Sequence, residues 1–109
     1  MMKGLIVLTA ASLFAATVCA EDMPVFKLVA KDGKFTPNTI EAPAGKRFKI
    51  EIENQGTSAI EFESKPLRQE KVLAPGAKSF VVINGIKAGT YKFFDEYHET
   101  TGQGQIIVK

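Results

Sequence analysis

The chain has 109 residues, with 14 basic side chains, 12 acidic side chains and one cysteine, and its net charge is +2. A chain of this length holds a single domain. Its lysines and arginines are scattered and form no stripe with interleaved aromatic residues, which argues against a nucleic-acid partner.

Residues 1–20 have the pattern of a secretory signal peptide. Lys3 precedes an apolar run over 5–18, and Val18-Cys19-Ala20 offers a small-residue cleavage site. We expect cleavage after Ala20, export to the periplasm and a cysteine-free mature domain over 21–109. Lipidation of Cys19 is the alternative, although Val18 is bulkier than the residue expected before a lipidated cysteine. No later apolar stretch approaches the roughly 20 residues that a membrane span needs, so we expect no transmembrane segment in the mature chain.

The mature chain has apolar residues at a period of two, which is typical of strands with one buried face. In the segment 46–53, Phe48, Ile50 and Ile52 alternate with charged residues. Pro66 is expected to prevent ordinary ladder pairing near it. Glycine and proline turns recur every 8 to 12 residues or so, which predicts an all-β Greek-key sandwich of about seven to eight strands. Strands are expected over 25–31, 39–42, 46–53, 59–63, 78–83, 91–95 and 105–108.

The segment 91–105 carries the densest group of candidate metal ligands. It starts as an aromatic strand, places Asp95 and His98 at the strand end, and is expected to break at Gly102 and Gly104. Carboxylate oxygens and an imidazole held beside a rigid strand are ligands that divalent and trivalent metals accept. The pattern therefore predicts a metal site at this end of the strand.

A second acidic pair, Glu61 and Glu63, is separated by Phe62 in a short predicted strand. Residues two apart in a strand share one face, so both carboxylates are expected to point the same way. Periodicity alone leaves open whether this pair lies at the same end of the sandwich as His98.

The mature chain resembles a small cupredoxin over its whole length. The segment F-T-P-N-T-I-E-A-P-A-G-K at 35–46 is similar to the family's second-strand signature. A-P-G at 74–76 and G-T-Y-K-F at 89–93 also lie where cupredoxins carry them.

The most specific part of this resemblance is the spacing of Asp95, His98 and Gln103. In blue copper cupredoxins these positions hold the cysteine, the second histidine and the methionine ligands, and the earlier histidine falls near Glu61. The resemblance therefore implies a copper site rewritten in carboxylates. The metal ligands it implies are Glu61, Glu63, Asp95, His98 and Gln103.

The ligand chemistry restricts the metal. A blue copper centre requires a thiolate, and the mature chain has no cysteine, so blue copper is excluded. Carboxylates with one imidazole suit Fe(II), Fe(III), Mn(II) or a non-blue Cu(II), and copper would bind tightest of the divalent ions.

Acid-rich cupredoxins with an E-x-E element resemble the periplasmic components of bacterial Efe/Ftr-type ferrous iron uptake systems. Glu61-Phe62-Glu63 matches that element. The resemblance implies an accessory protein that binds iron or non-blue copper and assists a membrane iron permease. Two alternatives stay open, a copper-dependent ferroxidase and a metal-free sandwich that docks a membrane partner.

Each candidate ligand also has an ordinary structural interpretation. A lone histidine is often a surface or core residue. Glu61 and Glu63 fit the solvated face of a strand, Asp95 fits a turn cap, and Gln103 fits loop chemistry. These interpretations predict no metal at the site.

Overall fold

The computed structural model describes residues 23–109. The expected signal peptide over 1–20 and its cleavage site lie outside these residues. Within them the chain forms nine strands and no helix, and so it contains no helix that could cross a membrane. The predicted all-β class is confirmed. The strands are β1 Val25–Lys31, β2 Lys34–Thr36, β3 Thr39–Ala42, β4 Phe48–Asn54, β5 Ile60–Ser64, β6 Gln69–Leu73, β7 Lys78–Ile83, β8 Gly89–Asp95 and β9 Gln103–Val108.

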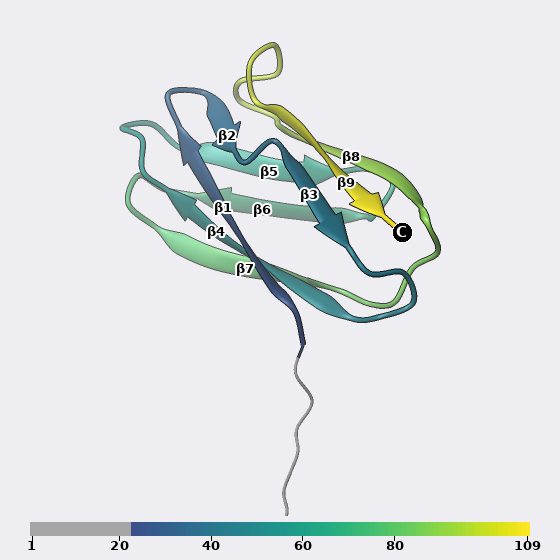
Figure 1. The fold of residues 1–109 in the computed structure, drawn as a ribbon. Coiled ribbons are helices and arrows are strands. Elements are labelled where there is room, and N and C mark those ends of the chain that lie inside the picture. The colour runs from purple at the N-terminus through teal and green to yellow at the C-terminus, as the bar shows by residue number, and fades with distance from the viewer. Residues whose placement is uncertain (1–22) are drawn as a thin grey trace, which may run out of the picture.

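The strands form two sheets that pack face to face (Figure 1). One sheet has four strands in the order β2-β1-β4-β7, and the other has five in the order β3-β9-β8-β5-β6. β1 runs parallel to β4, and β3 runs parallel to β9, while the other pairs are antiparallel. This crossing of the chain between the sheets is the expected Greek-key sandwich.

Strand β4 shows how the sequence specifies the two faces. Phe48, Ile50 and Ile52 are fully buried between the sheets, and the intervening Glu51 and Glu53 are partly exposed on the outer face. A period of two matches the alternation of side chains in a strand. The binary pattern therefore fixes which face of the strand contacts the core.

Three phenylalanines from both sheets fill the core beneath the end of β8. Phe35 of β2 lies edge-on to Phe93 of β8, with ring centroids 5.3 Å apart, and edge-on to Phe62 of β5 at 6.1 Å. Edge-to-face contacts of this kind add to the stabilisation from burial. The aromatic cluster thus gives the strand ends above it a rigid base.

The expectation that Pro66 prevents ladder pairing is wrong. Pro66 lies in the turn between β5 and β6, and the two strands pair over five positions from Ile60↔Leu73 to Ser64↔Gln69. A proline in a turn removes no ladder hydrogen bond. Two of the nine observed strands, β6 and the short β2, were not predicted from the period-two pattern.

Strand β9 begins two residues earlier than expected, at Gln103, so that Gly104 lies inside the strand. A Cβ atom at Gly104 would overlap the ring of Phe93 and lie 2.8 Å from the Asn38 carbonyl oxygen. Glycine is thus required here by close packing and does not break the strand.

Candidate functional site

Asp95 ends β8 with its side chain directed into the sandwich. Tyr91, Phe93 and Asp95 share the inner face, and Asp95 is only 2% exposed. Its Cα is paired with Phe62, another inward-facing residue of β5. The strand period therefore places a carboxylate in a nearly water-free position.

Three hydrogen bonds hold the Asp95 carboxylate. Its Oδ1 accepts from the backbone N–H of Glu61, at 2.9 Å, and from that of Tyr97, at 3.0 Å. Its Oδ2 lies 2.7 Å from Nδ1 of His98. An ionised carboxylate has about four acceptor positions, so three of them are filled by this chain.

His98 lies in the loop after β8 and is directed toward the end of the sandwich where Asp95 lies. Its backbone N–H donates to the Asp95 carbonyl at 2.9 Å, and its own carbonyl accepts from Gly102 at 2.7 Å. The imidazole is 29% exposed, and its carbons lie close to Gly33 in the turn between β1 and β2. The histidine therefore contacts both sheets.

Thr101 and Gly102 lie in the loop between β8 and β9 and hold it close to the β1–β2 turn and to the end of β8. The Thr101 hydroxyl donates to the Gly33 carbonyl at 2.6 Å. A Cβ atom on Gly102 would lie 2.7 Å from Cβ of Asp95, so only glycine allows the loop to approach the strand end this closely. The sequence pattern indicated neither contact, because both depend on how the sheets are placed.

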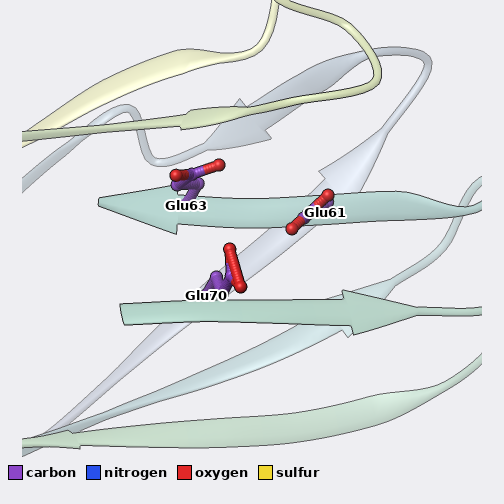
Figure 2. Close-up of side chains that lie close together, drawn as sticks. All are labelled: Glu61, Glu63 and Glu70. Carbon is purple, nitrogen blue, oxygen red and sulfur yellow. The ribbon is translucent and has the colours of Figure 1, made fainter. Parts of the chain in front are cut away.

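Glu61 and Glu63 lie on the outer face of the five-stranded sheet, pointing away from Asp95. There they meet Glu70 of β6, which is paired directly opposite Glu63. One ligand oxygen from each of the three carboxylates lies within 4.8 Å of the others. Figure 2 shows the three side chains converging from the two neighbouring strands.

A fourth glutamate, Glu96, approaches this group from the end of β8. A hydrogen bond with the Glu96 carboxyl, with partial burial and the charges of Glu96 and Glu70, raises the pKa of Glu63 from 4.5 to about 7. Partial burial and the charges of Glu70 and Glu96 likewise raise the pKa of Glu61. We call Glu61, Glu63, Glu70 and Glu96 the glutamate cluster.

The fifth predicted ligand, Gln103, belongs to neither group. Its side-chain N–H donates to the Glu99 carbonyl at 2.8 Å, and it lies on the exposed start of β9. The structure thus places the predicted ligands in three positions, with Asp95 and His98 together, Glu61 and Glu63 on the outer face, and Gln103 at the start of β9.

Sequence reasoning missed Glu70 and Glu96 as members of the acidic group. Glu70 is brought next to Glu63 by the β5–β6 pairing. This pairing was not expected, because Pro66 was predicted to prevent it. Glu96 follows Asp95 and therefore points outward, and its N–H donates to the Glu61 carbonyl at 2.8 Å. A search for a hairpin around the turn at 65–68 would have brought Glu63 and Glu70 together.

Comparison with known proteins identifies a domain family that this chain matches. A model of the cupredoxin-like domain matches residues 4–108. An uncharacterized protein of Rickettsia prowazekii (strain Madrid E) is 37% identical over 82 residues. That match covers 75% of this chain and 66% of the relative, just under two thirds of the relative's length.

Two solved structures share the fold at low sequence identity. Auracyanin A, a blue copper protein from Chloroflexus aurantiacus, has a TM-score of 0.67 at 15% identity, covering 81% of this chain and 100% of its own. The metal-binding domain of the Cu(I)-exporting P-type ATPase CopA of Streptococcus pneumoniae D39, solved with Cu(I), has a TM-score of 0.70 at 14% identity. That match covers 78% of this chain and 84% of the other.

A blue copper centre does not fit the residues of this site. Such a centre needs a cysteine thiolate, and residues 23–109 contain no cysteine. Asp95, which the sequence resemblance aligns with that cysteine, is buried and accepts three hydrogen bonds from its own chain. The donor set that remains is made of hard carboxylate oxygens.

Proposed function

The chain belongs to the cupredoxin-like domain family, and from this premise we propose that it binds a metal cation in the periplasm through the glutamate cluster. The bound cation is iron or a non-blue copper ion, and the protein acts as an accessory component of iron uptake. This assignment moves the metal away from the strand end and onto the outer face of β5 and β6.

The observation that carries the proposal is the convergence of Glu61, Glu63 and Glu70 to within 4.8 Å. Glu63 and Glu70 are directly opposed across the β5–β6 ladder, and like charges in that position repel each other. A cation bound between these carboxylates would replace the repulsion with attraction. A hydrogen bond with the Glu96 carboxyl and partial burial raise the pKa of Glu63 to about 7, and the negative charges of Glu96 and Glu70 add to this rise.

The chemistry of the donors supports a hard or borderline metal. Carboxylate oxygens suit Fe(II), Fe(III) and Mn(II), and a non-blue Cu(II) also binds such oxygens. Harder oxygen ligands favour the higher charge of Fe(III) over Fe(II). The cluster would therefore hold iron in the form that an Efe/Ftr-type permease takes up, and the Glu61-Phe62-Glu63 element supports this comparison.

Calorimetric titration tests the site directly. Exported, purified protein is titrated with Cu(II), with Mn(II) and, under anaerobic conditions, with Fe(II). We expect Glu63→Gln to weaken binding at least about tenfold, because it removes a central ligand oxygen charge. Glu53→Gln is the matched control, since Glu53 lies on the outer face of the other sheet. Equal binding by the wild type and Glu63→Gln would reject the cluster as the site.

Iron oxidation separates the accessory role from the ferroxidase alternative. The loss of Fe(II) in air is followed with and without copper-loaded protein. An accessory protein binds Fe(II) stoichiometrically and shows no turnover. Repeated turnover that depends on copper would favour the enzyme.

A further inference from the structure

We infer that Asp95 and His98 form a metal-independent clasp, which occupies the position of the family's copper centre and closes this end of the sandwich. The clasp comprises the two side chains and the backbone N–H groups of Glu61 and Tyr97. It predicts that a cation which binds this protein does not coordinate Nδ1 of His98. The inference does not depend on the glutamate cluster being a metal site.

The first step is the state of the Asp95 carboxylate. It is 2% exposed, and three donors of the same chain converge on it at 2.7 to 3.0 Å. A buried charge is tolerated when it is paired and hydrogen-bonded, and this one is satisfied without an ion. A metal at Asp95 would have only the one remaining acceptor position on Oδ2, in a side chain that is 2% exposed.

The second step is the orientation of His98. Because the carboxylate accepts the third hydrogen bond as it accepts the other two, Nδ1 of the imidazole carries the proton. A protonated ring nitrogen cannot coordinate a metal. The ring also lies beside Gly33, where an added Cβ would be 3.2 Å from its Cδ2, so a side chain at residue 33 would crowd the imidazole.

The third step is the divergence of the other positions that the cupredoxin resemblance assigns to ligands. Glu61 gives this end of the sandwich its backbone N–H, while its side chain lies in the cluster on the outer face. The Gln103 amide donates to the Glu99 carbonyl. The four positions therefore do not converge on one ion, and hydrogen bonds rather than a metal close this end of the sandwich.

One consequence is that the loop over 95–102 is ordered without metal. Proteins whose folding depends on a metal lose their structure in chelator. Here Asp95 links β5 to β8, while His98 and Thr101 contact the β1–β2 turn of the other sheet. These contacts, with the backbone hydrogen bonds among Asp95, His98 and Gly102, hold the loop closed.

Nuclear magnetic resonance of the histidine side chain tests the clasp. His98 is the single histidine of the chain, so its ring nitrogens are assigned without ambiguity in a long-range 1H–15N spectrum. In metal-free protein we expect a proton on Nδ1, and we expect Nδ1 to keep this proton when Zn(II) is added in excess. An unprotonated Nδ1 in the metal-free protein, or loss of the Nδ1 proton on addition of Zn(II), would overturn the inference.

Thermal unfolding supplies a second readout. Asp95→Ala leaves two backbone N–H groups and Nδ1 without their acceptor, and we expect Tm to fall by about 10 °C or more. The fall should be the same in chelator and in excess Zn(II). If Asp95→Ala does not fold, Asp95→Asn replaces it, because its Oδ1 retains the two backbone acceptances and only the His98 contact changes. A fall in Tm that appears only with metal present would contradict the clasp.

The two proposals fail separately. If calorimetry detects no cation binding while Nδ1 is protonated, the proposed metal function is rejected and the clasp is supported. If added cation removes the proton from Nδ1 while Glu63→Gln leaves cation binding unchanged, the clasp is rejected and the metal lies at the strand end.

Discussion

Glu63 on β5 lies directly opposite Glu70 on β6, so that two negative side chains occupy one cross-strand pair on the outer face of the five-stranded sheet. Opposite charges or apolar side chains are the stabilising choices at such a position. We therefore expect the pair to lower the stability of the metal-free protein, and substitution or protonation of either glutamate should change that stability.

Glu63 predicts a pH-dependent stability. Its pKa is raised from 4.5 in the ordinary case to about 7 in the folded protein, so between these values the folded state binds more protons than the unfolded state. Stability should therefore fall as the pH rises from about 4.5 to about 7. Denaturant unfolding of metal-free protein at pH 5 and pH 8 measures the difference. Glu63→Gln should reduce it, and an unchanged difference would exclude Glu63 as its source.

Charge reversal at Glu70 should stabilise the metal-free protein. Glu70→Lys places an ammonium group opposite Glu63, and an opposite-charge pair replaces the repulsion. We expect a higher Tm at pH 8, a smaller gain at pH 5 and weaker cation binding. Differential scanning calorimetry at both pH values makes the comparison. Glu41→Lys is the contrasting variant, because it breaks the ion pair between Glu41 on β3 and Lys109 and should therefore not raise Tm. A Tm at pH 8 that falls with Glu70→Lys would contradict the repulsion.

Asn54 predicts a strong dependence on side-chain chemistry in the core. It is fully buried, its Nδ2 donates to the carbonyls of Ser58 at 2.9 Å and Leu73 at 3.1 Å, and its Oδ1 accepts from Gly56. Asn54→Ala should cost about 2 to 4 kcal/mol in the free energy of unfolding. Urea unfolding measures this cost. The exposed Asn38→Ala should change stability far less, and a comparable loss at both sites would argue against the buried hydrogen bonds.

Gly104 predicts a packing conflict with Phe93. A methyl group at residue 104 would overlap the Phe93 ring, so Gly104→Ala should cost about 1 to 3 kcal/mol in stability. The double variant with Phe93→Leu should recover part of the cost of the alanine, because the two positions are in contact. Additive losses in this double-mutant cycle would show that the conflict lies elsewhere, such as at the Asn38 carbonyl.

The alternation of apolar residues predicted the fold well because each sheet has one buried face. Phe48, Ile50 and Ile52 show this in β4, and Tyr91, Phe93 and Asp95 lie on the inner face of β8 as expected. The pattern did not reveal β6, because its residues are mostly polar and it lies at the edge of a sheet, where burial imposes little alternation.

The site was harder to predict because it depends on register between strands. Sequence spacing brings Asp95 close to His98, and the structure places these two side chains 2.7 Å apart. The relation of Glu61 to Asp95 depends on the pairing of Phe62 with Asp95, which directs neighbouring side chains to opposite faces of the sheet. A one-residue change in that register would have placed Glu61 inside. The alternation of Ile60 and Phe62 with the two glutamates favours the outer face for Glu61, where the structure places it.

Residue 61 takes part in the two regions through different atoms. Its main chain joins the strand end, donating to the Asp95 carboxylate and accepting from the N–H of Glu96, while its side chain faces outward among carboxylates. Any residue that tolerates a strand can supply the same N–H and carbonyl. The side chain at this position is therefore open to redesign. An imidazole or a thiolate could be introduced at residue 61 to change the metal preference, while the main-chain hydrogen bonds to Asp95 and Glu96 are kept.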